Sequence, residues 1–457
     1  MSELARLAQF VSGLTFGDLP ADVREHCAVL VADSVGCTLG ALQTAEGRNT
    51  ARALRRCSAP APDAPGYLVY GSYDLLAGLS VDAALGNLLD FDDTYEVSGH
   101  VGCVVVPVAL RLGAQRGASG NQVLGAAAAG FEAGCRVLKA TRPGTAARSL
   151  VWGIGCRVAP AAAATAAALL GLGPEATAHA LALACCTGPV PSVRKTVYGQ
   201  HGVTWAKNNM SAAAVAGVTA AFVAGEGAKG PLDVLEGDEG FFRMIGSDRW
   251  DAEALCGGLG AEWELLRLGL KPYPCCRHLH AAIDAATQGL QDLGVETRDL
   301  TEMKFAGPVW LRNAAMRNAA PGDMLDAQFS LPYCIAVSLL GFPPGPEWFR
   351  RDAYGDPDVR HLAGLVGVNE EVTLEQETRV AMSGGGRSVT ASIAVPRGSR
   401  QRPLSAEEQE AKFRRLVAGV LDGDQAAAVY DDLLDAAALR DIRAITARFP
   451  PVAVEGD

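Results

Sequence analysis

Three aspartates and a histidine lie close together early in the chain, in a pattern that could move a proton. Asp90, Asp92 and Asp93 occupy three of four consecutive positions, and His100 follows in a glycine-rich loop. On a helix Asp90 and Thr94 are four residues apart and share one face. Carboxylates repel each other at a helix C-terminus, so a compensating group is expected. The pattern predicts a proton-transfer site, and a solvated helix end with an ordinary loop histidine is the alternative.

A second concentration of reactive side chains lies in the ten residues from Lys271 to His280. Lys271 and Arg277 are suited to bind substrate carboxylates, arginine through two parallel hydrogen bonds. Cys276, His278 and His280 suggest proton transfer or metal binding, but the further ligands of a zinc site cannot be identified. We therefore predict no metal site. The alternative is a rigid hinge with His280 packed inside the following helix.

The polar loop 194–207 contributes weaker candidates. Lys195, His201 and Lys207 lie in it, just before a predicted helix, and their positive charges could face an anion. A solvated loop fits equally well. Gly384–Gly386 lacks a following Lys-Ser/Thr helix and predicts a hairpin turn rather than a phosphate loop. The absence of GxGxxG after a strand and of GxSxG argues against a dinucleotide oxidoreductase and an α/β-hydrolase.

Up to about residue 268 the sequence is helical in pattern, because apolar residues recur every three or four positions and alanine is abundant. The abundance of alanine predicts closely packed helices. The predicted helices are 21–39, Ser80–Asp93, Gly120–Leu138, Pro160–Leu172, Pro174–Cys186 and Ser211–Gly225.

After residue 270 the pattern becomes mixed. Strands are predicted at 301–305, 372–374, 378–382 and 389–395, and helices at His278–Leu290 and Ser330–Leu340. The tail from Ser405 to Phe449 is helical again and opens with a capping box. If this tail packs on the first helices, the α+β unit is an insertion.

The composition and net charge of the chain limit the binding partners and the cellular compartment that we expect. The 457 residues carry a formal charge of −11, which argues against nucleic acid and anionic membranes as partners. No secretory signal or transmembrane stretch is recognised. The 12 cysteines include no CxxC, which predicts a reduced compartment without structural zinc. We expect a cytoplasmic protein.

Taken in order, several motifs resemble the MmgE/PrpD family, which includes 2-methylcitrate dehydratases, cis-aconitate decarboxylases and an iminodisuccinate epimerase. The likeness covers nearly the whole chain. The motifs are DSVG at 33–36, LLDFDDTYEVSGH at 88–100, AAAATAAALLGLG at 161–173, VLEGDEGFF at 234–242, LKPYPCCRHLHAAIDA at 270–285, QFSLPYCIAVSLL at 328–340 and PRGSRQRPLSAEEQEAKF at 396–413.

The resemblance implies a mainly α fold. A large all-helical domain would be built from both chain ends, 1–268 and 400–457, with a smaller α+β lid domain inserted at 269–399 and a cleft between them. It also implies a homodimer and catalysis without a required cofactor.

Family site residues map onto Asp90, Thr94, His100 and Lys271, and Lys207 lies within one residue of a further expected lysine. Two positions depart from the decarboxylase pattern: Trp152 and Cys276 stand where those enzymes carry histidines, although cysteine at the second position also occurs in other members. Tryptophan cannot exchange a proton near neutral pH. We therefore expect a substrate larger or more apolar than a tricarboxylate.

We predict a cofactor-independent lyase of dehydratase or decarboxylase type, acting on a small carboxylate-bearing substrate by proton transfer α to a carboxylate or carbonyl. In this hypothesis His100 is the acid and base, Asp90 orients it, and Thr94 hydrogen-bonds the substrate. Lys207 and Lys271 hold carboxylates and stabilise enolate-like charge. Further residues expected at the binding site are Trp152, Cys276, Arg277, His278 and His280.

Three alternatives remain open from the sequence. The same residues could support an isomerase or epimerase. A repurposed biosynthetic enzyme, such as a cyclase on a bulkier, more apolar substrate, would fit Trp152. A non-catalytic binding protein is the third.

Overall fold

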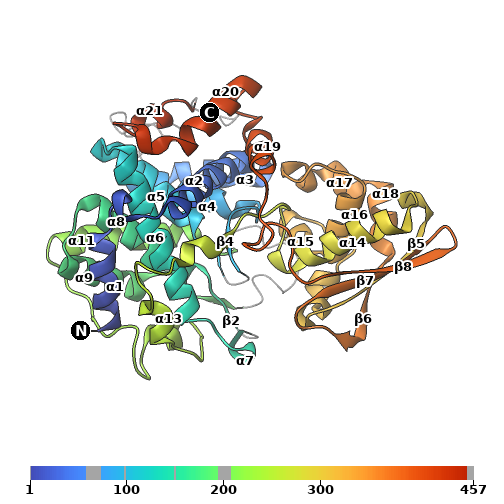
Figure 1. The fold of residues 1–457 in the computed structure, drawn as a ribbon, viewed down its shortest axis with the longest axis horizontal. Helices are drawn as coiled ribbons and strands as arrows, with labels where there is room; N and C mark the ends of the chain where they lie inside the picture. Colours follow the sequence, from blue (N-terminus) through green and yellow to red (C-terminus); the bar gives the residue numbers. More distant parts are fainter. Residues whose placement is uncertain (1, 58–73, 97–98, 149–150, 194–206, 450–457) are drawn as a thin grey trace.

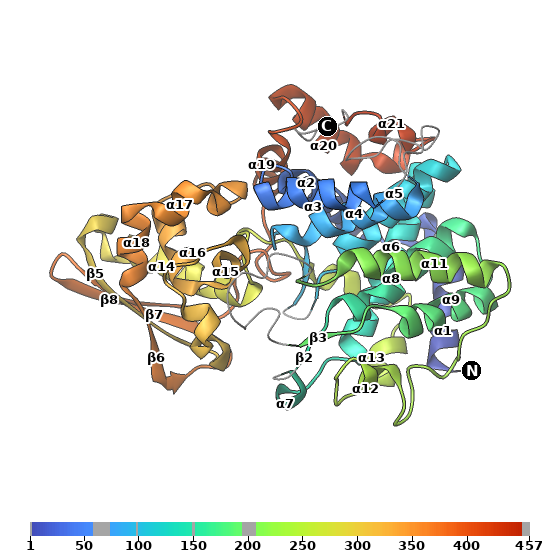
Figure 2. The same ribbon diagram turned by 180° about the vertical axis from the view of Figure 1, so that it is seen from behind.

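The computed structural model describes residues 2–57, 74–96, 99–148, 151–193 and 207–449. Most of its regular structure is helical, and the sheets are small, which confirms the predicted mainly α class. In Figures 1 and 2 helices α1 to α13 gather on one side of the molecule, and α14 to α18 with β5 to β8 gather on the other.

The first group is a set of closely packed helices. Its longer members are α1 (Glu3–Gly13), α2 (Ala21–Ala41), α3 (Ala45–Arg56), α4 (Leu75–Leu88), α5 (Gly102–Arg116), α6 (Gly120–Ala140), α8 (Gly155–Leu170), α9 (Pro174–Thr187) and α11 (Met210–Gly225). Helix α8 packs against α5, α6, α9 and α11. Small side chains allow this, since a Cβ added at Gly217 of α11 would collide with the backbone oxygen of Ala159 on α8.

Four of the predicted helices, those now seen as α2, α6, α9 and α11, are confirmed. The predicted start of α8 at Pro160 is wrong, because the helix begins at Gly155 and Pro160 lies inside it. A proline removes one helical hydrogen bond, and here the buried residues around it hold the helix together. The predicted helix Ser80–Asp93 is also wrong at its end, since α4 stops at Leu88.

The second group is built on a four-stranded sheet of order β6-β5-β7-β8. Its strands are β5 (Leu300–Gly307), β6 (Val366–Thr373), β7 (Thr378–Gly384) and β8 (Arg387–Ile393), and only the β5–β6 pair is parallel. Helix α14 (His280–Leu293) packs on β7 and β8, while α16 (Leu331–Leu339) packs on α14 and α18 (Pro357–Gly364). The hairpin predicted at 384–386 is confirmed.

Strand β6 is longer than the three residues predicted for it. It begins at Val366 and contains Asn369, Glu370 and Glu371. Charged side chains lower the β propensity of a sequence, but at the edge of a sheet they remain in water and discourage pairing with other chains. For this reason the sequence pattern predicted only the last part of this strand.

Several shorter elements complete the fold. They are β1 (Thr94–Tyr95), α7 (Thr145–Arg148), β2 (Val151–Trp152), β3 (Ser192–Val193), α12 (Phe241–Met244), α13 (Ala252–Cys256), β4 (Leu268–Gly269), α15 (Met324–Phe329) and α17 (Arg351–Gly355). Strand β1 pairs with β4, and β2 with β3. Within the described ranges no single helix is both long and apolar enough to cross a bilayer; α2 and α3 together pass the same test but are bent by 92°.

The chain returns to the first helices at its end. Helices α19 (Ala406–Val417), α20 (Gly423–Leu434) and α21 (Arg443–Thr446) lie beside α2 and α5 in Figures 1 and 2. The predicted capping box is confirmed, because Ser405 and Glu408 cap α19 reciprocally.

A buried lysine ties α19 to the loop that carries the three aspartates. Nζ of Lys412 lies 2.6 Å from Oδ1 of Asp33 on α2 and donates a hydrogen bond of 2.7 Å to the carbonyl oxygen of Phe91. The same ammonium lies 4.1 Å from the centroid of the Phe91 ring. Because Phe91 stands between Asp90 and Asp92, the last part of the chain supports the aspartate loop.

We expect Lys412→Met to destabilise the protein strongly, because it leaves the Asp33 carboxylate buried without its cation. Breaking such a pair costs about 3–5 kcal/mol, which urea denaturation would measure. Arg414→Ala is the matched control on the same helix: its pair with Glu410 is exposed and should contribute less than about 1 kcal/mol. Equal, small losses in the two variants would contradict the supporting role of Lys412.

Candidate active site

The three aspartates lie in a turn rather than on a helix. Helix α4 ends at Leu88, and Asp90 has a left-handed backbone with φ of 50°. Asp90 and Thr94 therefore do not share a helical face, and that prediction is wrong. Asparagine and aspartate tolerate the left-handed conformation better than most residues, and a strained turn of this kind is common where a side chain must be aimed precisely.

Two lysines from distant segments meet the Asp90 carboxylate. Nζ of Lys271 lies 2.8 Å from Oδ1 of Asp90 and also donates to its carbonyl oxygen at 2.8 Å. Nζ of Lys207, just before α11, lies 2.9 Å from the same Oδ1. Pairing of Thr94 in β1 with Gly269 in β4 brings the Lys271 segment alongside the turn. The structure thus brings together two of the lysines that the sequence singled out.

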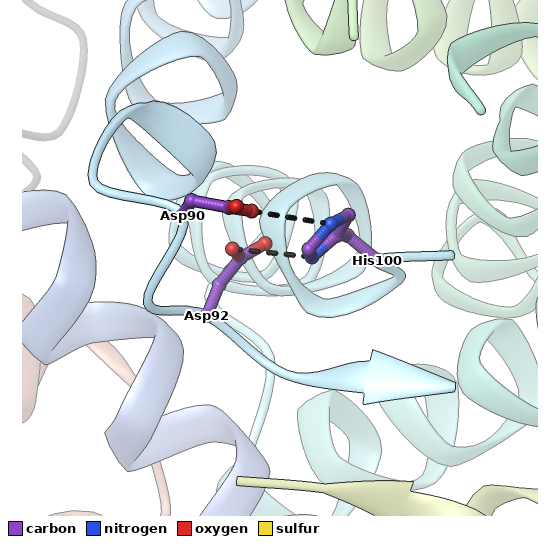
Figure 3. A group of neighbouring side chains, drawn as sticks. All are labelled: Asp90, Asp92 and His100. Atoms are coloured by element: carbon purple, nitrogen blue, oxygen red, sulfur yellow. Dashed lines mark ion pairs between the residues drawn. The ribbon is translucent and has the colours of Figure 1, made fainter. Parts of the chain in front are cut away.

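His100 lies between two of the aspartates, as Figure 3 shows. Its Nε2 lies 3.5 Å from Oδ1 of Asp90, and its Nδ1 lies 3.3 Å from Oδ1 of Asp92. Nδ1 is also 2.9 Å from the carbonyl oxygen of Asp93. Since a carbonyl oxygen only accepts, Nδ1 carries a proton, and Nε2 is the nitrogen that can gain or lose one beside Asp90.

Asp93 fixes the backbone that carries the imidazole. Its two carboxylate oxygens accept hydrogen bonds from the backbone N–H groups of Val101 and Gly102, at 3.0 and 2.7 Å. Burial, followed by the charge of Asp92, raises the pKa of Asp93 to about 7. Asp93 therefore anchors the start of α5 and is poised to change its charge near neutral pH.

The charges in the cluster support each other. Burial disfavours the ionised form of Asp90, but Lys207 and Lys271 outweigh it and hold the pKa of the carboxyl well below its usual value. Burial likewise opposes ionisation of Asp92, and His100 lowers its pKa. For Lys271, burial acts to lower the pKa, but Asp90 and Asp92 raise it above the usual value. At neutral pH the two carboxylates and the Lys271 ammonium are charged.

Three amide side chains complete the site. Asn87 donates to both carboxylate oxygens of Asp92, at 3.0 and 3.1 Å, and accepts from Asn208 at 2.6 Å. Gln328 donates to the Leu88 carbonyl oxygen at 2.7 Å and accepts from Lys207 at 3.4 Å. Sequence reasoning missed Asn208 and Gln328, although the first follows Lys207 directly and the second opens one of the family-like motifs.

A small pocket opens beside these amides. Lys207, Asn87, Asn208 and Gln328 line it together with apolar residues of α4, α11 and α15, and its cavity volume is about 70 Å³. The Lys207 side chain is 10% exposed, whereas that of Lys271 is 1% exposed. Lys207 is therefore the lysine of the pair that a substrate can reach in this conformation.

The remaining predicted binding residues do not all join this cluster. Cys276 is close to it: its backbone N–H donates to the Gln328 carbonyl oxygen at 2.8 Å, and burial raises the pKa of its thiol to about 12. His278 packs against Trp310, with ring centroids 4.4 Å apart and the ring planes tilted by 38°. Thr94 and Arg277 line a different cavity.

His280 fits the hinge alternative rather than a catalytic role. Its Nε2 donates to the Cys275 carbonyl oxygen at 3.2 Å, and its Nδ1 accepts from Arg277 at 3.0 Å. Burial, with the positive charges of Arg277 and Lys271, holds its pKa well below the usual value. His280 is thus a neutral, fully packed residue at the start of α14.

Two predictions fall partly or wholly outside the described residues. The backbone of Trp152 pairs with Ser192 in the β2–β3 ladder, but its side chain is outside the description. Lys195 and His201 are outside it entirely.

Asp90, Asp92 and His100 are close enough to hold a metal ion, since their ligand atoms lie within 4.8 Å of one another. Two ammonium groups already contact the Asp90 oxygen that faces His100. A divalent cation there would be repelled by both and would have to displace them. The donor set therefore favours a site neutralised by lysine.

The comparisons with known proteins agree with this arrangement of motifs. Residues 5–253 match the MmgE/PrpD N-terminal domain, and residues 273–436 match the MmgE/PrpD C-terminal domain. The chain belongs to the MmgE/PrpD family, and the resemblance inferred from its motifs is confirmed.

Two relatives match over nearly their full length. A cis-aconitate decarboxylase of Aspergillus terreus (strain NIH 2624 / FGSC A1156) is 26% identical over 474 residues, which cover 96% of this chain and 94% of that protein. The cis-aconitate decarboxylase-like protein oryM of Aspergillus oryzae (strain ATCC 42149 / RIB 40) is 24% identical over 475 residues, covering 97% and 96% of the two chains.

The Asp90–Lys271 pair predicts a pH window of stability. Because the pKa of Asp90 is lowered on folding, its contribution is present above about pH 4 and is lost as pH falls through the native value. Because the pKa of Lys271 is raised, its contribution is present below about pH 10 and is lost as pH rises through the native value.

We therefore expect the loss of unfolding free energy in Lys271→Met to be largest inside this window and to shrink at both ends. Urea denaturation across the pH range measures it. Lys304→Met, at an exposed position of β5, is the matched control and should show no such window. A penalty for Lys271→Met that does not vary with pH would contradict the ion pair.

Because lysines neutralise the aspartate cluster, we expect that a chelator does not change the stability of the protein. Dialysis against EDTA should leave the midpoint of thermal unfolding unchanged, because no cation is needed to hold Asp90 and Asp92 near His100. A lower midpoint that is restored by adding back a divalent metal would show that the cluster binds one.

Proposed function

We propose that this protein is a cofactor-independent lyase of the dehydratase or decarboxylase type that acts on a small carboxylate-bearing substrate. The observation that carries the proposal is the position of Nε2 of His100, 3.5 Å from an Asp90 carboxylate that two lysines keep ionised. An imidazole beside a fixed anion is suited to accept a proton, since the resulting imidazolium is stabilised where it forms.

In the proposed reaction Nε2 of His100 removes the proton α to a carboxylate or carbonyl, and the electron pair moves onto that group as an enolate. Lys207, with the amides of Asn208 and Gln328, is placed at the pocket to stabilise this charge. Collapse of the enolate expels hydroxide, which takes up the proton held by His100 and leaves as water. In the decarboxylase version, His100 starts protonated: CO2 leaves first, the imidazolium delivers its proton to the resulting carbanion, and solvent then reprotonates the ring.

The role expected for Lys271 changes in this proposal. Its side chain is buried, and its ammonium group donates hydrogen bonds to Asp90. We therefore propose that Lys271 positions Asp90 and keeps its carboxylate ionised, rather than binding substrate. The role of Lys207 stays as expected from the sequence. Membership of the family and the similarity to a cis-aconitate decarboxylase support the lyase class. Trp152 and Cys276 favour a substrate other than cis-aconitate.

We further propose the domain organisation 1–268 and 400–457 for the helical domain, with 269–399 as a lid that covers the site. The separation of the two groups of elements in Figures 1 and 2 supports it. A cytoplasmic homodimer is the accompanying proposal, and the acidic net charge of −11 argues against nucleic acid and anionic membranes as partners.

The test is incubation with a panel of short di- and tricarboxylates and apolar acids in D2O, followed by mass spectrometry. A dehydratase gives a product lighter by water without added deuterium, whereas a decarboxylase gives a product lighter by CO2 with one deuterium at the carbon that lost the carboxylate. Loss of the acid and base lowers turnover by about 10²- to 10⁴-fold, so His100→Gln should fall in this range. His361→Gln, an exposed histidine on α18, is the matched control and should keep full activity.

Other outcomes separate the alternatives. Incorporation of deuterium into the substrate without loss of water or CO2 would identify an isomerase or epimerase. Full turnover in His100→Gln would remove the proposed role of the imidazole. Saturable binding of panel compounds without any turnover would overturn the lyase and favour a binding protein.

A further inference from the structure

Helix α3 presents two polar side chains to the pocket beside Lys207. Glu46 and Thr50 are four residues apart on this helix, so they share one of its faces, and both line the pocket. Lys207 lines another wall of the same pocket. Including the part that is open to solvent, the space between these walls is about 690 Å³, which is enough for a small organic molecule.

Within the ranges that the structure describes, neither of these side chains on α3 has a partner. Thr50 is only 7% exposed, yet its hydroxyl makes no hydrogen bond. The buried helical threonines Thr38 and Thr165, by contrast, each donate to the carbonyl oxygen four residues earlier, at 2.9 Å. The half-buried carboxylate of Glu46 forms neither an ion pair nor a hydrogen bond. Buried polar groups are normally satisfied, so a partner is expected in the pocket.

The α3 wall is therefore a place for a hydrogen-bond donor with a positive charge. Glu46 lies in the first turn of α3, where the helix dipole favours a negative charge. Its carboxylate only accepts hydrogen bonds, and the Thr50 hydroxyl can accept one as well. A negatively charged group placed beside Glu46 would be repelled.

The rest of the pocket differs from this wall. Its other charged and polar end is formed by Lys207 with the amides of Asn208 and Gln328, which suit a carboxylate. Lys207 and Glu46 form no ion pair with each other, so their charges act at separate places in one pocket. The apolar residues in the lining are Ala84, Leu88, Met210, Met324 and Leu325.

We propose that the substrate of this site carries an ammonium group as well as its carboxylate, with an apolar carbon chain between them. The carboxylate lies toward Lys207. The ammonium, which has three N–H donors, lies at Glu46 and Thr50. This inference rests on the proposed function, because it takes the pocket beside Lys207 as the substrate pocket.

Glu46 is then the residue that selects the substrate by the charge of its far end. A second carboxylate at that end meets the negative charge of Glu46. A methyl group at that end leaves the Glu46 carboxylate and the Thr50 hydroxyl without partners, which is costly once the ligand displaces water. An ammonium group satisfies both.

Isothermal titration calorimetry at pH 7 tests this with matched straight-chain acids of three to six carbons. At each length the far end is a methyl, an ammonium or a second carboxylate, from propanoate, 3-aminopropanoate and malonate to hexanoate, 6-aminohexanoate and adipate. At the best-fitting length we expect the ω-amino acid to bind about ten-fold more tightly than the fatty acid, which corresponds to about 1.4 kcal/mol. The diacid should bind most weakly.

Variants of the α3 wall should change this order. Glu46→Gln keeps the size of the side chain and removes its charge, so the preference for the ω-amino acid should fall to about two-fold or less. Thr50→Val should reduce the preference about three-fold and leave binding of the fatty acid unchanged. Glu302→Gln removes an exposed carboxylate on β5 and is the matched control, which should keep the full preference.

Three results would overturn the proposal. The first is that no ω-amino acid binds more tightly than the fatty acid of the same length. The second is that the preference persists in Glu46→Gln, and the third is that Glu302→Gln loses as much of it. Thermal unfolding of each variant shows whether it is folded, and Thr50→Val provides an independent test if Glu46→Gln is unstable.

The proposed lyase and the ammonium site can fail separately, because binding is measured without turnover. The β-hydroxy derivatives of the same acids are added to the turnover panel, since they supply a leaving group. Turnover of acids that lack an ammonium group, with no preference for ω-amino acids, would keep the lyase and overturn the ammonium site. A preference that Glu46→Gln abolishes supports the ammonium site even if no panel compound is turned over.

Discussion

The whole site depends on keeping one carboxylate charged inside the protein. Asp90 is 2% exposed, and burial alone would favour its neutral form. Two ammonium groups reverse that preference, one from the segment after β4 and one from the segment before α11. Because each lysine reaches Asp90 from a different part of the chain, the buried carboxylate stays ionised only when both segments have packed beside it.

Further hydrogen bonds and ion pairs stabilise the residues next to Asp90. Lys412 donates a hydrogen bond to the backbone of Phe91 and is itself neutralised by Asp33. Helices α2 and α19 therefore stabilise the turn that contains Asp90 and Asp92. Asn87 holds Asp92, and the backbone of α5 is anchored by Asp93. A buried polar network is stable only if its members are satisfied together. This explains why charged residues from both ends of the chain lie in an otherwise apolar, alanine-rich interior.

The sequence predicted which side chains form the cluster better than it predicted their arrangement. His100, Lys207 and Lys271 were identified because reactive types stand out in an alanine-rich chain with few lysines. The end of α4 was misplaced because apolar periodicity continues past Leu88, whereas the left-handed turn at Asp90 depends on contacts with Lys271, 181 positions away. Gln328 was missed for the same reason: its role arises from packing against α4. Local patterns cannot reveal which distant residues meet.

The hydrogen bond from Nδ1 of His100 to the Asp93 carbonyl oxygen has a stereochemical consequence. It leaves the ring a single working nitrogen, so the hydrogen taken from a substrate and the hydrogen given back pass through one atom on one side of the bound molecule. Such an imidazole favours suprafacial chemistry, in which the hydrogen is taken from the substrate and passed to the departing hydroxide on the same face. Inversion at a carbon centre would demand another donor on the opposite side of the molecule.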